Sequence, residues 1–115
     1  MTRIIYHMCP AETWREAVRA GVYHGTADDR RDGFMHFSTA EQIAESARRH
    51  RAGQTGLVLI AVESDRLAAR LKWEKSRGDA LFPHLYGPLD TAEAASVHPL
   101  PLGADGEHIF PPLDP

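Results

Sequence analysis

The chain has 115 residues, of which 43% are hydrophobic and 25% charged, and its formal net charge is −3. This balance is typical of one soluble globular domain, and the small negative charge argues against a strong general attraction to nucleic acid or anionic lipid. No apolar segment is long enough to span a bilayer and no signal-peptide pattern is present, so we expect a cytoplasmic protein without a membrane partner. The single cysteine, Cys9, excludes an internal disulfide and a cysteine-cluster zinc site.

The first segment predicts a strand followed by an amphipathic helix. Residues 3–8 are apolar and β-prone, which indicates a strand. Pro10 suits the first turn of a helix and Gly21 suits its end. Three apolar residues between them have the spacing of one helix face, which we expect to be buried: Trp14, Ala17 and Val18.

A polar segment and a second strand–helix unit follow. Residues 22–33 are rich in turn formers, so we expect a loop with a short extended piece at its start. Residues 34–38 alternate apolar and polar side chains, which predicts a strand. Ser38 and Glu41 then form a capping-box pattern, so we predict a helix over residues 39–51 with Ser38 as its N-cap. The expected buried face of this helix consists of Ala40, Ile43, Ala44 and Ala47.

The second half predicts mainly strands. Residues 56–63 form a near-continuous apolar run, typical of a central strand. Further strands are expected near residues 69–73 and at 94–100, separated by a structured loop that is rich in glycine and proline and has room for a short strand at its middle. The tail, residues 101–115, should be irregular and anchored by Ile109 and Phe110. This order predicts a single α+β domain with two main helices against a mostly antiparallel sheet.

The seven histidines raise the question of a metal site. Zinc sites typically use close pairs such as H-x-H on a strand or H-x-x-x-H on a helix. None of the histidines has such a partner, so we expect no metal, although a site assembled from His7, His36 and His84 is an alternative. A Cys9–His7 pair on one face of the first strand is a second alternative, but we favour Cys9 as a small apolar residue.

His36 and Ser38 form an H-x-S motif on one face of the predicted strand. Met35 and Phe37 point to the opposite face, which is the natural core, so we predict that His36 faces a cleft. The N-terminus of the next helix would favour an anionic ligand there and would lower the pKa of His36. For Ser38, the pattern leaves open both an N-cap and a ligand contact.

The segment "LFPHLYGPL" is the second concentration of candidate residues. His84 and Tyr86 lie between two prolines in a stiff loop, where they can contact a ligand or close the core edge. Glu74 suits a ribose hydroxyl or a general base, and Arg77 suits a phosphate. Each of these two residues is equally consistent with an ordinary surface position.

Five blocks together resemble one bacterial family, catalogued as domain of unknown function number 952: "IYHM", "DGFMHFSTAEQ", "LVLIAVE", "LKWE" and "FPHLYGPL". The resemblance implies an ADP-ribosyltransferase-like fold, in which a split, mostly antiparallel sheet surrounds a nicotinamide-nucleotide cleft. A second resemblance is to the RNA 2′-phosphotransferases of that superfamily, whose early-strand histidine and H-x-S motif correspond to His7 and to His36 with Ser38. The chain departs from the pattern where a catalytic glutamate is usual on a late strand, and Glu74 is the nearest substitute.

We therefore expect a cleft for NAD or an ADP-ribose-type nucleotide, in an enzyme that transfers ADP-ribose or acts on a 2′-phosphate. The expected catalytic residues are His36, Glu74 and His84. The expected nucleotide contacts are His7, Ser38, Thr39, Arg77 and Tyr86. The alternatives are a non-catalytic nucleotide-binding module that lacks the glutamate, and a structural or interaction protein in which these residues only close the core.

Overall fold

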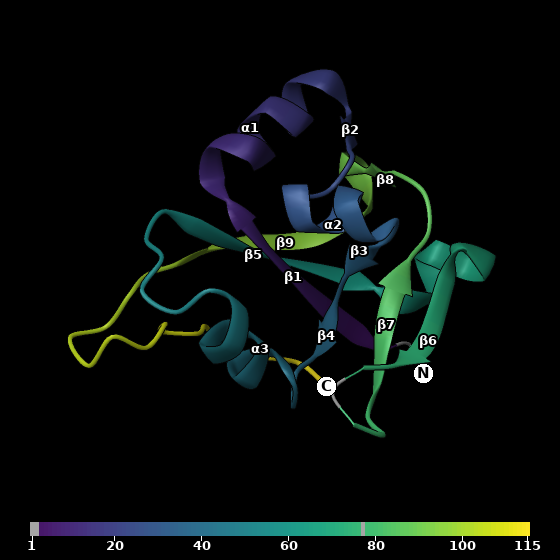
Figure 1. The fold of residues 1–115 in the computed structure, drawn as a ribbon. Coiled ribbons are helices and arrows are strands. Elements are labelled where there is room, and N and C mark those ends of the chain that lie inside the picture. The colour runs from purple at the N-terminus through teal and green to yellow at the C-terminus, as the bar shows by residue number, and fades with distance from the viewer. Residues whose placement is uncertain (1–2, 77) are drawn as a thin grey trace.

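The computed structural model describes residues 3–76 and 78–115, which form an α+β fold of antiparallel sheets and short helices (Figure 1). The α-helices are α1 (Ala11–Ala20), α2 (Ala27–Asp32) and α3 (Ile43–His50), and two 3₁₀ helices are η1 (Ser64–Arg70) and η2 (Thr91–Glu93). The strands are β1 (Ile4–Pro10), β2 (Val22–Tyr23), β3 (Met35–His36), β4 (Ser38–Thr39), β5 (Leu57–Glu63), β6 (Leu71–Lys75), β7 (Leu81–Leu85), β8 (Leu89–Asp90) and β9 (Ala94–Leu100). The α+β class is therefore confirmed.

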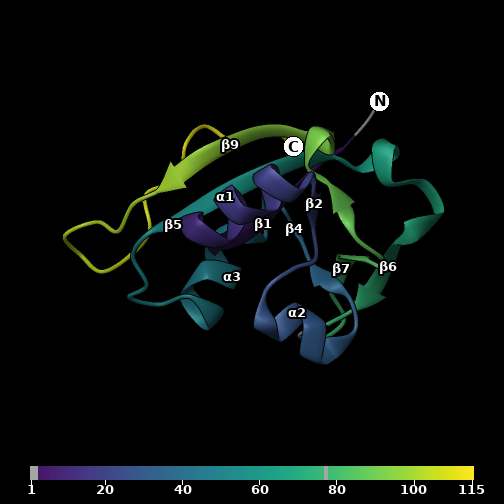
Figure 2. The ribbon, with the colours of Figure 1, turned by 90° about the horizontal axis from the view of Figure 1, so that it is seen from above.

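The main sheet has the strand order β4-β1-β5-β9, with every neighbouring pair antiparallel. As predicted, the apolar strand β5 is central, and its side chains contribute to two hydrophobic clusters. A second sheet has the order β3-β7-β6, and β2 pairs with β8. Figures 1 and 2 show α1 and α3 beside β1, and α2 next to β3 at the junction of the two larger sheets.

Helix α1 forms as its local signals predict, but its buried face is narrower than expected. Gly21 takes a left-handed conformation (φ 84°) and its N–H caps the last carbonyls of α1. Trp14 and Ala17 are buried, whereas Val18 is 53% exposed. Successive helix residues are about 100° apart around the axis, so Val18 lies to the side of the stripe that packs on the sheet.

Two expectations for the segment after α1 are wrong. The predicted loop contains α2, which begins with a reciprocal capping box between Thr26 and Asp29. The next helix begins at Ile43 with Gln42 as its N-cap, and Ser38 does not cap it. The reason is that Ser38 and Thr39 pair with β1 as strand β4, so the backbone cannot turn into a helix there.

In the second half, the predicted glycine- and proline-rich loop contains strands β7 and β8, while β6 and β9 lie close to their predicted positions. The C-terminal tail contains no long helix or strand and returns to the body of the protein. Phe110 packs against the hydrophobic cluster that includes Ile43 and Ala47 of α3, as expected, whereas the Ile109 side chain is 57% exposed and its backbone N–H donates to the carbonyl of Pro101. No helix in residues 3–76 and 78–115 has the length and apolar character that a membrane crossing needs.

Candidate functional site

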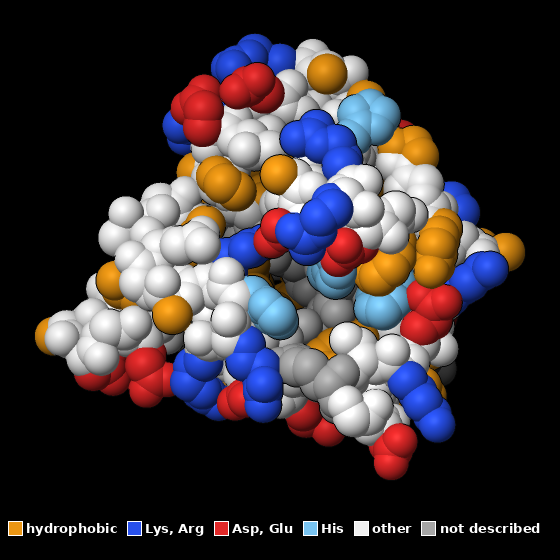
Figure 3. All heavy atoms as spheres, in the orientation of Figure 1, with side chains coloured by type: hydrophobic (Ala, Val, Ile, Leu, Met, Phe, Trp, Pro, Cys, Tyr) orange, Lys and Arg blue, Asp and Glu red, His pale blue; other side chains and the backbone are white. Residues whose placement is uncertain are grey.

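A cavity of about 140 Å³ opens at the junction of the two larger sheets. Figure 3 shows this hollow near the centre of the face, with histidine side chains beside it and acidic and basic side chains along its upper rim. Its apolar lining includes Tyr6, Met8, Phe37, Ile43 and Phe82. Its titratable lining consists of His7, Asp28, Asp29, Arg31, Asp32, His36, His50, Arg51 and His84. The three histidines singled out from the sequence therefore line one cavity, although they come from β1, β3 and β7.

The Asp29 carboxylate accepts three hydrogen bonds at the wall of this cavity, and sequence reasoning missed this residue. Its carboxylate is 3% exposed and accepts hydrogen bonds from the backbone N–H of Thr26 (2.7 Å) and from the backbone N–H of His36 (3.1 Å). The Nδ1–H of His36 donates to the same carboxylate at 2.6 Å. Burial alone would raise the pKa of Asp29, but the hydrogen bonds from His36 and Thr26 hold it below its usual value. The T-x-x-D pattern at Thr26 was the available signal for this helix start.

His7 is buried and held in one tautomer. Its Nδ1–H donates to the backbone carbonyl of His36 at 2.7 Å, so its Nε2 accepts a hydrogen bond from the hydroxyl of Tyr23 at 2.7 Å. Burial lowers the pKa of His7, so the ring is neutral near pH 7. Both ring nitrogens are thus used inside the protein. His7 shapes the cavity wall, and it has no ring nitrogen left for a nucleotide.

The thiol of Cys9 is not an activated nucleophile. Cys9 is fully buried, and burial raises its pKa to about 11. A thiol in that state remains protonated near neutral pH, so the favoured interpretation of Cys9 as a small core residue agrees with the structure.

His36 borders the cavity, but its charge state is the opposite of our expectation. Its Nδ1 faces Asp29 at 2.6 Å and its Nε2 faces Asp32 at 3.0 Å. The hydrogen bond to Asp29 is the main reason that the pKa of His36 is raised. The predicted lowering was wrong because α3 begins at Ile43, while two carboxylates of α2 lie against the ring. His36 therefore lies between two carboxylates that favour the protonated form of its ring.

Ser38 and Thr39 are both buried. The Ser38 hydroxyl lines the cavity and shares a 2.8 Å hydrogen bond with the Ser46 hydroxyl of α3. Thr39 does not line the cavity, and its backbone N–H donates to the Gln42 side chain at 3.0 Å. Only Ser38 of this pair is placed to contact a ligand in the cavity.

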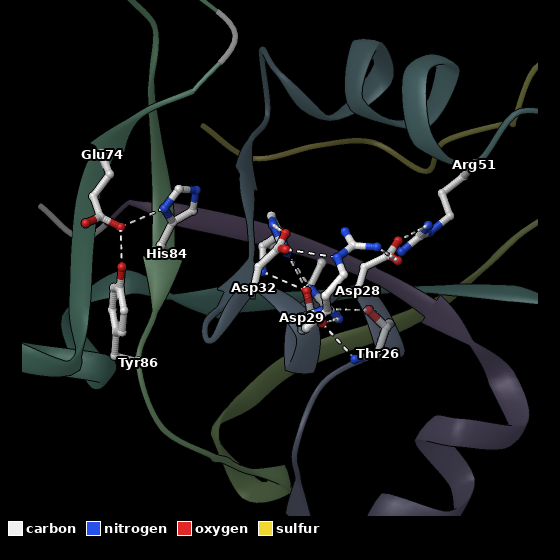
Figure 4. Close-up of polar contacts among 11 residues, drawn as sticks. Thr26, Asp28, Asp29, Asp32, Arg51, Glu74, His84 and Tyr86 are labelled. Carbon is white, nitrogen blue, oxygen red and sulfur yellow. Dashed lines mark hydrogen bonds and ion pairs between the residues drawn. The ribbon is translucent and has the colours of Figure 1, made fainter.

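His84 has one ring nitrogen fixed and the other without a partner. His84 is 5% exposed, and its Nδ1–H donates to Glu74 at 2.8 Å, while the Tyr86 hydroxyl donates to the same oxygen at 2.7 Å (Figure 4). Phe34 stacks on the ring with centroids 4.1 Å apart. Within residues 3–76 and 78–115 the Nε2 of His84 has no hydrogen-bond partner, so this lone pair is available to a ligand.

The other predicted residues stand outside the cavity lining. Glu74 and Tyr86 lie behind His84 and orient it. Arg77 lies outside the described residues. Arg51 was missed by the sequence analysis; its side chain is only 16% exposed and lines the cavity. In the described chain, no three histidine, cysteine or acidic side chains are grouped as a metal site would require.

The charge states of this network predict a stability maximum near pH 6.5. The pKa of His36 is raised, so its stabilisation is complete below its unfolded value of 6.5 and is lost as pH rises through the folded pKa. The pKa of His7 is lowered, so stability falls as pH drops from 6.5 toward its folded pKa. The pKa of Asp29 is also lowered, and its contribution is lost as pH falls from its unfolded value of 3.8 through the folded pKa.

Urea unfolding followed across this pH range measures the profile. His36→Gln should remove most of the loss of stability above pH 6.5 (the alkaline limb of the profile) and leave the loss below pH 6.5 (the acid limb) in place. His98→Gln, which changes an exposed histidine on β9, should leave both limbs unchanged. An alkaline limb that persists in His36→Gln would contradict the assignment.

These features define an α+β domain with a compact, histidine-lined cavity at the junction of two antiparallel sheets. The chain belongs to the family described as "Protein of unknown function (DUF952)", whose model matches residues 8–97. It is similar to the X-ray structure of protein CC0527 from Caulobacter crescentus, with 44% identity, a TM-score of 0.89, and coverage of 92% of this chain and 93% of that one. The solution NMR structure of CC0527 gives 45% identity, a TM-score of 0.82 and 90% coverage of each chain. No curated protein matches the chain.

Proposed function

We propose that the cavity binds the nicotinamide–ribose part of NAD or an ADP-ribose-type nucleotide, in an NAD-dependent transferase-like enzyme. The observation that carries the proposal is the buried ring of His84, which lines a cavity of about 140 Å³ while Glu74 holds its Nδ1. A carboxylate-oriented histidine with one available nitrogen is the usual arrangement of an acid–base group.

The size and lining of the cavity suit a heteroaromatic ring with a polar substituent. A cavity of about 150 Å³ is known to hold a benzene ring, and Phe37, Phe82 and Ile43 provide apolar walls here. The Nε2 of His84 can accept a hydrogen bond, which matches an amide or ribose hydroxyl donor. The rest of a dinucleotide is too large for the cavity and would extend through its mouth past Arg51 and His36.

The chain's own residues would bind and orient the nucleotide and would move a proton. The apolar walls and His84 would hold the nicotinamide–ribose end, and the cations at the mouth would hold the phosphates. When bound, NAD supplies a ribose carbon from which nicotinamide can leave. His84 would exchange a proton at Nε2 with an acceptor hydroxyl, while the hydrogen bond from Nδ1–H to Glu74 orients the ring. The same groups would suit a 2′-phosphate on a ribose.

A specific observation favours the second candidate, a nucleotide-binding module without catalysis. The described cavity lining contains no glutamate, and Glu74 is already bonded to His84 and Tyr86. A site of this kind would recognise the nucleotide without transferring ADP-ribose.

Calorimetric titration with NAD, ADP-ribose, AMP and nicotinamide tests the proposal. We expect saturable binding of NAD and ADP-ribose that is tighter than binding of AMP, because AMP lacks the group that fills the cavity. Release of nicotinamide from NAD, measured on the same sample, separates the enzyme from the binding module. Absence of any heat at millimolar NAD and ADP-ribose would sink the proposal in both forms.

A further inference from the structure

The two cations at the cavity mouth are each held by a carboxylate from α2. The Nε2 of His36 lies 3.0 Å from Asp32 Oδ2, and Nη1 of Arg51 lies 3.5 Å from Asp28 Oδ2. His36 comes from β3 and Arg51 follows α3, so neither cation belongs to the helix that neutralises it. Figure 4 shows Asp28, Asp29 and Asp32 together on α2, with Arg51 reaching toward Asp28 from the α3 side.

The two carboxylates have a second counterion of their own. Arg31 donates to Asp28 Oδ1 at 3.2 Å and to Asp32 Oδ1 at 3.1 Å. The Asp28 and Asp32 side chains are 49% and 34% exposed, whereas Asp29 is 3% exposed. Asp28 and Asp32 can therefore rotate into solvent and keep Arg31 as a partner, while Asp29 stays in place.

We propose that a diphosphate ligand binds Arg51 and His36 with its anionic oxygens in the positions that Asp28 and Asp32 occupy in the free protein. The two carboxylates therefore compete with the ligand for these two cations. This inference rests on the proposed function and names the part of the nucleotide that the mouth receives. Residues four apart on a helix have Cβ atoms about 5–6 Å apart, so the two carboxylates span a distance that two linked phosphates can also span.

The surrounding charges support an anion site once these two side chains turn away. His36 keeps Asp29 as a partner on Nδ1, and this contact raises its pKa and so favours the charged ring. The other titratable groups facing the mouth are Arg31 of α2, His7 of β1, His50 of α3 and His84 of β7. Diphosphate affinity should fall as pH rises through the pKa of His36.

The test is calorimetric titration of the full chain with inorganic pyrophosphate and with ADP-ribose. The variant Asp28→Asn/Asp32→Asn should bind both about threefold to tenfold more tightly than the unmodified chain, because two competing anions are removed. A charge-matched control, Glu16→Gln/Asp65→Asn, removes two exposed carboxylates that make no ion pair in the described chain. Arg51→Gln added to the Asn pair should abolish the gain.

The outcomes distinguish this inference from the proposed function. Tighter pyrophosphate binding in the Asn pair alone supports the inference, even if NAD and nicotinamide fail to bind and the proposed function fails. An equal gain in the charge-matched control would show only a general effect of net charge and would overturn it. Unchanged or weaker pyrophosphate binding in the Asn pair, with a normal unfolding transition, would overturn it as well, whatever nicotinamide does.

Discussion

Asp29→Ala is expected to lower the free energy of unfolding by about 3–5 kcal/mol, because it removes the buried acceptor of two backbone N–H groups and the carboxylate partner of the partly exposed His36. The substitution leaves the backbone N–H groups of Thr26 and His36 without their acceptor and leaves the His36 imidazolium without its inner carboxylate. Chemical denaturation at pH 6.5 measures the loss. Detachment of α2 from β3 should accompany it, seen as faster amide exchange in residues 27–32.

A neighbouring acid provides the matched control for this prediction. Asp32→Asn removes a carboxylate from the same helix and the same histidine, but the Asp32 side chain is 34% exposed and its effect on stability should be much smaller than that of Asp29. In a double-mutant cycle, Asp29→Ala and His36→Gln together should cost less than the sum of the single changes. Equal losses from Asp29→Ala and Asp32→Asn would contradict the central role of the buried carboxylate.

His84→Phe is expected to weaken NAD and ADP-ribose binding about tenfold or more while the protein remains folded. Phenylalanine keeps a planar ring for stacking on Phe34 but removes the Nε2 acceptor, so a ligand donor would be buried without a partner. Glu74→Gln should weaken binding less, because it only loosens the preference for the tautomer that presents Nε2 as an acceptor. Titration calorimetry measures both losses.

The exposed histidine variant His98→Gln serves as the control and should bind as the unmodified chain does. Unfolding curves recorded on the same samples separate lost affinity from lost structure. Full NAD affinity in a folded His84→Phe protein would remove His84 from the site.

The accuracy of the sequence-based fold prediction depended on whether local signals or distant partners decide each element. Gly21 ends α1 through its own backbone freedom, and the apolar run of β5 requires burial in any compact fold, so both were predictable. Helix α2 has no apolar periodicity, since five of its six residues are charged. It is held by the contact between Asp29 and His36, which no local pattern contains.

In the candidate site, too, the features set by local sequence were predictable and those set by distant residues were not. Alternation along residues 34–38 correctly predicted that Met35 and Phe37 are buried and that His36 borders the cavity, but Phe37 lines the cavity as well. The direction of the His36 pKa was wrong because it depends on acids in a segment that was expected to be a loop. Likewise, the local capping pattern at Ser38 was overridden by pairing with β1, which only the folded sheet brings close.

The most direct measurement is an NMR titration that follows the ring nitrogens of the histidines as NAD or ADP-ribose is added. The account predicts that Nε2 of His84 changes from an unpartnered acceptor to a hydrogen-bonded one, with a large shift that saturates with the calorimetric affinity. Nδ1 of His84, bonded to Glu74, and both nitrogens of buried His7 should change little. Saturable binding that leaves His84 Nε2 unshifted, or no shift in any cavity histidine at millimolar ligand, would contradict the account.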